Sequence, residues 1–437
     1  MNHRKKLLIV PGNVIYPLSL GSSVAQNGMI DFLRRHFDIA LFVGPNNVSE
    51  NDLPELANAW PDVRFFKWGY RARSPRRKPA YPRQWFYWAR SRYRKWQDRG
   101  ETVQNKDIDN ILFNVSLMTN LVPSEKATSL ARVVREHVFD LIQFDLPENI
   151  SLVHTVGPVK AKKIFVHHEI KSERVRSHID TRRVPSPYGR YLHGSLQAVE
   201  VGHLNAYDAL VVLTDADRQR LVDRLKVNPP VYTSPFAIPD ALGLKVNRAA
   251  DEFAVDKVIF LGPYQHFPNY DGVEWLLENV YPKVQSRLNL PWFILGKWNL
   301  KDEKVGRWAN LPGVTFTGFV DDLQPYFENA LMLAPIRIGG GIKTKILQGM
   351  LNGLPIIGHG VAFEGIDPVD GEAVLIRETP EGYAEAVLKL AAEPRWASGI
   401  GGRARRLVVD RFSQENAGDI RHRVLMRILE TDTIGDR

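Results

Sequence analysis

The chain has 437 residues, 44% of them hydrophobic, which is enough for two domains of ordinary size and excludes a disordered or fibrous protein. It has no cysteine, so disulfide bonds and thiolate chemistry are excluded, in keeping with a reducing compartment. The net charge of +9 is uneven: residues 1–240 hold 35 Lys and Arg against 24 Asp and Glu, or +11, whereas the remainder holds 23 against 25, or −2.

The first elements along the chain indicate an α/β fold. The apolar run from Leu7 to Val10 is followed by Pro-Gly and is too short for a signal sequence, so we interpret it as the first strand. A helix is expected near residues 23–36, and a second strand in "IALFVG", residues 39–44. No apolar stretch approaches the roughly 18 residues needed to cross a bilayer. We therefore expect a cytoplasmic protein and leave open a peripheral position at the inner face of the cell membrane.

Residues 71–100 form a basic and aromatic insertion, with eleven basic residues against one acidic residue. Such side chains together suit an anionic lipid surface, a lipid-phosphate substrate or nucleic acid, and a solvated surface insertion is the plain alternative. Because aromatic side chains cluster there, we favour the membrane and expect no nucleic-acid partner. The candidate membrane or acceptor contacts are Arg76, Arg77, Trp85, Trp88, Arg92 and Trp96.

Apolar strand-like runs continue along both halves and alternate with helical patterns. They are "FDLIQF" (139–144), "KKIFVHHE" (162–169), "YDALVVLT" (207–214), "KVIFLG" (257–262), "WFILG" (292–296), "VTFTG" (314–318), "ALMLAP" (330–335), "PIIGHG" (355–360) and "AVLIR" (373–377). This alternation predicts two doubly wound, Rossmann-like domains with parallel sheets. Prolines cluster at residues 228–240, so we place the domains at 1–235 and 236–437. For the charged last helix, packing back on the N-terminal domain is left open.

The stretch "RIGGGIKTKILQGMLNGLP", residues 337–355, follows a predicted strand. Ile342, Ile346 and Met350 recur at helical spacing, so the three glycines precede a helix at the carboxyl end of a parallel strand. Free amides and the helix dipole favour an anion there, and glycines let it approach the backbone. Diphosphate charge would be neutralised by Arg337, Lys343 and Lys345. A tight turn with solvated lysines is the alternative.

Two further loops are expected on the same edge of the second sheet. "FLGPYQHFPNYDG" follows the first strand of that domain and places Gly262, His266 and Asn269 beside the glycines. "GHGVAFEGI" follows a later strand and adds Glu364. Three polar or glycine-rich loops on one edge favour a binding site over a plain turn.

Four motifs follow one another in the second half: "F-x-G-x-x-x-x-x-P-N-x-D-G", "V-x-F-x-G-x-V-D-D-L", "P-x-R-x-G-G-G-I-K-x-K-I-L" and "G-x-P-I-I". Their order resembles the donor domain of GT-B fold glycosyltransferases, and more narrowly the glycine-rich branch of the retaining glycosyltransferase family 4. The resemblance covers about residues 255–370 and is only architectural in the N-terminal half. It implies a GT-B architecture, with two Rossmann-like domains facing across a cleft.

The resemblance also implies a mechanism. A nucleotide-diphospho-sugar would bind the C-terminal domain and an acceptor the N-terminal domain, in a retaining, metal-independent hexosyltransferase without a cofactor. Lys343, Lys345 and the amides of the loop Gly339–Gly341, those of Gly340 and Gly341 above all, would stabilise the leaving diphosphate.

This sequence departs from the family pattern at the donor site. The family commonly has two glutamates separated by seven residues, and the matching positions here are Gly340 and Gln348. Gln348 stands where the second glutamate would accept a hydrogen bond from the donor ribose, and it adds no charge. The arginine and lysine that usually follow the first strand of this domain are also missing.

Fewer residues carry over to the N-terminal domain. Gly21 and Ser22 match the family's glycine loop before the first helix, and His168 resembles the strand-terminal histidine that approaches the transferred sugar. A purely structural role for the pair His167 and His168 is the alternative. Adjacent strand residues point to opposite faces, so we expect no metal site. Asp145 could be a cleft carboxylate, which an inverting enzyme would need as a base.

The leading hypothesis is therefore a glycosyltransferase that moves a sugar to a glycan or lipid-linked acceptor. The basic-aromatic insertion suits a polyprenyl-diphosphate-linked acceptor at an anionic membrane surface, which would place the enzyme in bacterial surface polysaccharide synthesis, such as exopolysaccharide, capsule or O-antigen. The alternatives are a sugar-nucleotide epimerase of the same fold and a basic nucleic-acid- or membrane-binding protein with a degenerate donor site.

Overall fold

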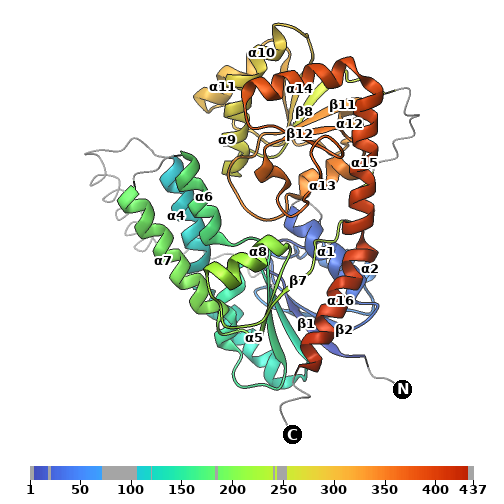
Figure 1. Cartoon of the computed structure of the whole chain (residues 1–437). Coiled ribbons are helices and arrows are strands. Elements are labelled where there is room, and N and C mark those ends of the chain that lie inside the picture. Colours follow the sequence, from blue (N-terminus) through green and yellow to red (C-terminus); the bar gives the residue numbers. More distant parts are fainter. Residues whose placement is uncertain are drawn as a thin grey trace, which may run out of the picture.

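The computed structural model describes residues 4–17, 21–70, 106–119, 121–182, 186–239, 242–243 and 253–431. Its described strands form two parallel sheets, of seven and six strands. Figure 1 shows each sheet in its own lobe, with helices packed around it. We call these the N-terminal and the C-terminal lobe.

The N-terminal sheet has the order β3-β2-β1-β4-β5-β6-β7. Its strands are β1 (Lys6–Val10), β2 (Asp38–Val43), β3 (Arg64–Lys67), β4 (Leu141–Asp145), β5 (Lys162–His167), β6 (Ala209–Val212) and β7 (Val231–Thr233). The helices described with it are α1 (Gly21–Leu33), α2 (Leu53–Ala59), α4 (Lys106–Thr119), α5 (Ser124–Glu136), η2 (Pro147–Thr155), α6 (Lys171–Arg182), α7 (Ser186–Leu204), α8 (Asp215–Gln219) and η3 (Arg220–Arg224).

The C-terminal sheet has the order β10-β9-β8-β11-β12-β13. Its strands are β8 (Lys257–Leu261), β9 (Trp292–Leu295), β10 (Val314–Gly318), β11 (Ala330–Ala334), β12 (Ile356–Gly358) and β13 (Leu375–Ile376). The helices that follow β8 in the chain are α9 (Phe267–Trp275), η6 (Leu276–Val280), α10 (Tyr281–Gln285), α11 (Glu303–Ala309), α12 (Gln324–Phe327), α13 (Thr344–Leu351), η7 (Gly360–Phe363), α14 (Pro380–Ala392), α15 (Pro394–Phe412) and α16 (Gln414–Glu430).

The predicted strands are confirmed because the apolar runs belong to strands that helices cover on both faces. Every residue of the central strands β4 and β11 is buried. The edge strands β3 and β7 were missed. β3 has exposed ends, and β7 lies inside the proline-rich segment 228–240 that we took only as a domain join. Edge strands are short and partly solvated, so they lack the long apolar run that marks a central strand.

Two helix boundaries differ from the sequence prediction. α1 ends at Leu33, where residues 34–36 form a turn, so the predicted helix over 23–36 extends too far. α13 begins at Thr344, because Lys343 takes the extended N-cap conformation, and this leaves Ile342 in the preceding loop.

The chain crosses between the lobes along two neighbouring segments. The amide of Ile238 donates a hydrogen bond of 2.8 Å to the carbonyl of Phe412, and α16 then runs down the N-terminal lobe (Figure 1). α16 packs against α1, and Ala417 and Leu425 join the same core as Phe32. The last helix is therefore part of the N-terminal core, although β13 and α15 belong to the other lobe.

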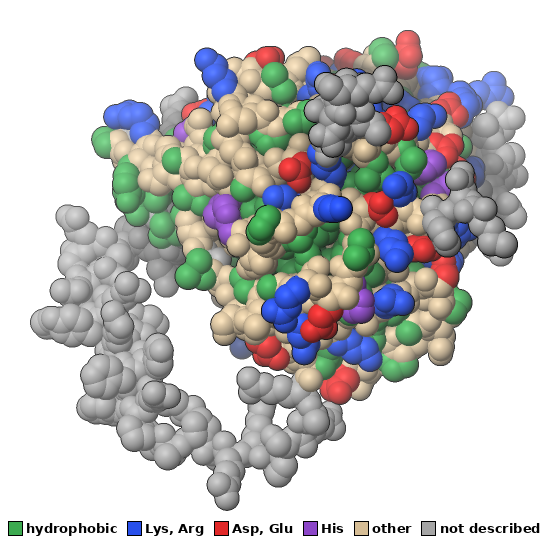
Figure 2. Space-filling view, turned by 90° about the horizontal axis from the view of Figure 1, so that it is seen from below, with side chains coloured by type: hydrophobic (Ala, Val, Ile, Leu, Met, Phe, Trp, Pro, Cys, Tyr) green, Lys and Arg blue, Asp and Glu red, His purple; other side chains and the backbone are tan. Residues whose placement is uncertain are grey.

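The basic-aromatic insertion, including Arg76, Arg77, Trp85, Trp88, Arg92 and Trp96, lies outside the described residues. Over the face drawn in Figure 2, Lys and Arg side chains are interspersed with Asp and Glu. Among the described helices, none is long and apolar enough to cross a membrane.

Candidate active site

The glycine loop lies where the two lobes meet. It connects β11 to α13, and Gly341 has a φ of +65°, which favours glycine. A Cβ atom on Gly341 would lie 2.8 Å from the carbonyl oxygen of His168, in the loop after β5. The loop therefore needs glycine both for its conformation and for its close approach to the N-terminal lobe.

A carboxylate from the N-terminal lobe contacts this loop. The amide of Gly340 donates to Glu169 Oε1 at 3.4 Å, and Glu169 Oε2 accepts from Lys171 Nζ at 2.7 Å and Arg174 Nη1 at 3.0 Å. Burial alone would raise the pKa of Glu169, but the adjacent Arg174 and Lys171 hold it well below its ordinary value. Glu169 is therefore ionised. Its carboxylate lies beside the Gly340 amide, in the loop where we expect an anion to bind.

Two lysines converge behind the same loop. Lys345 Nζ donates to Asn269 Oδ1 at 2.6 Å and lies 4.4 Å from the centre of the Phe260 ring. Burial, and then repulsion from Lys343, lowers the pKa of Lys345 to about 7. Lys343 Nζ donates to the carbonyl of Gly341 at 2.8 Å, and burial lowers its pKa as well. A bound anion would stabilise the charged form of both ammonium groups.

The loop after β8 forms one wall of this site. Asn269 donates from Nδ2 to the carbonyl of Pro263 at 2.9 Å, which fixes the oxygen that Lys345 contacts. A Cβ atom on Gly262 would lie 2.5 Å from Asn269 Nδ2, so glycine is required there. His266 is exposed at the start of α9 and lies within electrostatic reach of Lys345.

Two residues that we assigned to the donor are held by protein partners. Arg337 donates from Nε and Nη2 to Asp271 at 3.0 and 2.8 Å, and Asp271 is fully buried. Glu364 forms ion pairs with Lys343, at 3.7 Å, and with Arg220 from the N-terminal lobe. Arg337 therefore braces the loop against α9, and the two lysines are the cations left to face a bound anion.

Gln348, Gly21 and Ser22 were also assigned to the donor. Gln348 lies half-buried in the second turn of α13, beyond the lysines. Gly21 and Ser22 are the first two residues of α1.

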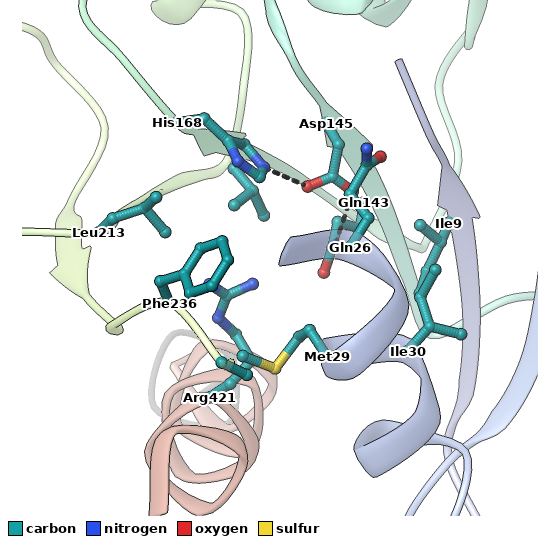
Figure 3. Close-up of a pocket in the computed structure, with 12 residues that line it drawn as sticks. Ile9, Gln26, Met29, Ile30, Gln143, Asp145, His168, Leu213, Phe236 and Arg421 are labelled. Atoms are coloured by element: carbon teal, nitrogen blue, oxygen red, sulfur yellow. Dashed lines mark hydrogen bonds and ion pairs between the residues drawn. The ribbon is translucent and has the colours of Figure 1, made fainter. Parts of the chain in front are cut away.

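On the N-terminal side, His168 and Asp145 point toward each other in a small pocket (Figure 3). His168 Nε2 and Asp145 Oδ1 are 3.2 Å apart, and Asp145 Oδ2 accepts from Gln143 Nε2 at 2.8 Å. Arg421 reaches the pocket from α16. Its Nε donates a hydrogen bond of 2.7 Å to Ser234 Oγ, and burial lowers its pKa to about 10. The structure therefore brings together two of the predicted catalytic residues.

His167 and His168 have different surroundings. His167 is buried with its Nε2 3.0 Å from Glu200 Oε1, and Glu200 also accepts hydrogen bonds from the amides of Lys171 and Ser172. Glu200 thereby caps α6 and fixes the loop that carries His168 and faces the glycines. Across the described ranges, no group of three or more His, Asp or Glu residues could hold a metal ion.

Several residues that hold the site were not assigned a role from the sequence. Glu169, Lys171 and Arg174 lie in the charged run that follows β5, which was a visible signal, although only their neighbour His168 was assigned a role. Arg220 and Arg421 gave no signal, because Glu364 and Ser234, which they contact, are far away in the sequence: Arg421 and Ser234 are 187 residues apart.

The two lobes, each with a parallel sheet covered by helices, have the GT-B fold. Among solved structures, the chain is similar to sucrose-phosphate synthase from Thermosynechococcus elongatus, with a TM-score of 0.65 and 13% identity over 98% of this chain and 100% of the other. It is similar to TarM, with a TM-score of 0.65 and 11% identity over 98% and 99%. It is also similar to Anabaena HepE in complex with UDP and glucose, with a TM-score of 0.60 and 10% identity over 97% and 100%. At these identities the likeness shows the fold.

Residues 255–393 match the family model of the glycosyl transferases group 1, which covers β8 through α14. The protein has the GT-B fold, and the family match over its C-terminal lobe supports a glycosyltransferase. A comparison with curated protein sequences finds no match. The match and the fold confirm the predicted resemblance to GT-B glycosyltransferases.

Proposed function

We propose that the protein transfers a sugar from a nucleotide-diphospho-sugar to a glycan or lipid-linked acceptor in bacterial surface polysaccharide synthesis. The observation that carries the donor site is the convergence of Lys343, Lys345 and the glycine-loop amides where β11 meets α13. Each lysine has a lowered pKa in the free protein, so both gain from a bound diphosphate.

In this proposal the leaving diphosphate binds beside Lys343, Lys345 and the amides of the glycine loop. Negative charge grows on the diphosphate as the sugar bond breaks, and fixed ammonium groups and amides stabilise that charge without rearranging. Such stabilisation would let the nucleotide depart without a metal. On the opposite wall, His168 faces the transferred sugar, with its ring held by Asp145.

A donor screen with matched variants tests the donor site. A ligand that binds only the native state raises its melting temperature, so the chain is melted with UDP-, GDP-, dTDP- and ADP-sugars. Because the HepE structure holds UDP and glucose, the screen begins with UDP-glucose. Lys343→Ala and Lys345→Ala should each stay folded and lose the shift. Lys283→Ala, an exposed lysine of the same lobe, should keep it. Unchanged donor affinity in both site variants would remove the proposed site.

For the acceptor side we propose that the insertion at 71–100 holds the enzyme at an anionic membrane surface. Its eleven basic residues and its aromatic side chains support this, because such side chains bind anionic headgroups and the interface. In the sequence the insertion follows β3 and precedes α4, and both elements belong to the lobe that also carries His168. A polyprenyl-diphosphate-linked acceptor would then meet the cleft from the membrane side.

A further inference from the structure

Glu169 connects the two lobes at the proposed donor site. Its Oε1 accepts from the Gly340 amide at 3.4 Å, while its Oε2 is held in its own lobe by Lys171 and Arg174 at 2.7 and 3.0 Å. The side chain is 18% exposed. A carboxylate thus lies at a loop amide that an anion at the start of α13 would also contact.

The charges around Glu169 explain why a carboxylate is stable there. Lys171 and Arg174 approach it from the N-terminal side, and Lys343 lies within electrostatic reach from the C-terminal side. Without an anion, these cations and the free loop amides would repel one another across the lobe boundary. Glu169 provides one negative charge where a diphosphate would bring two.

The contacts of Glu169 are unequal in strength. The two bonds to the cations are short and charge-assisted, whereas the bond to Gly340 is long. The loop that carries Glu169 is also fixed by Glu200, which caps the first turn of α6. An incoming phosphate can therefore take the Gly340 amide while Glu169 keeps its partners in the N-terminal lobe.

We propose that Glu169 is an internal counter-ion of the donor site, which occupies the Gly340 amide in the free protein and is displaced from it by a donor diphosphate. This rests on the proposed function, because it assigns the displacing anion to the donor. In the free protein the same contact holds the glycine loop against the N-terminal lobe.

Removing the competing charge should strengthen anion binding. Glu169→Gln is expected to bind inorganic pyrophosphate and UDP about fivefold more tightly than the wild type, as expected for loss of one modest competing hydrogen bond. The matched control is Glu173→Gln. Glu173 lies four residues further along the chain, in the first turn of α6, and pairs with Arg176 and Arg224, at 2.9 and 2.6 Å. Its variant should bind both anions like the wild type. Isothermal titration calorimetry measures both constants.

The outcomes separate this inference from the proposed function. If the wild type binds UDP and Glu169→Gln binds it equally or more weakly, the counter-ion inference is wrong and the donor site stands. If neither protein binds pyrophosphate or any nucleoside diphosphate, both are wrong. Should Glu169→Gln fail to fold, Glu169→Asp decides, because it keeps the charge for Lys171 and Arg174 but is too short for Gly340. It should bind pyrophosphate more tightly than the wild type, and weaker binding would overturn the inference.

Discussion

The lowered pKa of Lys345 predicts that donor binding takes up a proton. In the free protein burial and Lys343 bring the pKa of Lys345 to about 7, below the ordinary lysine value of 10.5. A bound diphosphate favours the charged ammonium and raises this pKa again. Binding at a pH above about 7 must therefore protonate Lys345, so donor affinity falls as the pH rises through and beyond that value.

The size of this pH dependence follows from the uptake of one proton by Lys345. Between pH 7.5 and pH 9 the charged fraction of Lys345 in the free protein falls about twentyfold, and the donor affinity should fall by the same factor. The diphosphate of a donor such as UDP-glucose has no titrating oxygen in this range, so the slope does not come from the phosphates. Calorimetry in two buffers of different ionisation enthalpy counts the protons directly.

The control for this prediction keeps the charge. In Lys345→Arg the donor affinity should depend on pH more weakly, by about one proton, because a guanidinium stays charged to above pH 12. Equal slopes in the wild type and Lys345→Arg, or an affinity that rises with pH, would refute the assignment of the proton to Lys345.

Three other changes give clear expectations. Gln348→Glu should tighten donor binding about fivefold in calorimetry, since a carboxylate accepts a hydrogen bond from a ribose hydroxyl more strongly than an amide does. Unchanged or weaker binding would show that Gln348 does not contact the ribose. Deleting residues 71–99 should move the protein from the membrane to the soluble fraction after cell lysis, and an unchanged distribution would exclude the insertion as an anchor. Gly418→Ala should cost about 1–3 kcal/mol in the free energy of unfolding by urea, because its Cβ would lie 2.2 Å from the Phe32 ring. Gly402→Ala, where a Cβ meets nothing within 4 Å, should cost nothing, and equal losses in both would contradict the packing of α16 on α1.

Sequence patterns predicted the parts of this fold that repeat a strong local signal. Central strands such as β4 and β11 are apolar along their whole length, and the spacing of Ile346 and Met350 marks the buried face of α13. The edge strand β7 and the return of α16 to the N-terminal core carry no such signal. Their stability comes from neighbours that are far away in the chain, such as Phe32 beside Gly418.

The candidate site follows the same rule. The glycine loop, Lys343 and Lys345 could be predicted, because these residues are neighbours in one continuous stretch of the sequence. The partner of Arg337 could not, since Asp271 comes from another loop and takes up the charge that we had assigned to the donor. Nor could the approach of Glu169 to Gly340, because it requires the two lobes to meet.

The most direct test of the account is sugar transfer itself. The full chain is incubated with the donor that stabilises it and with a membrane lipid extract, and release of the nucleoside diphosphate is measured. We predict release that requires both donor and extract and is lost in the Lys343→Ala, Lys345→Ala double variant. Absence of release with every one of the four donor classes, or equal release by the double variant, would contradict the account.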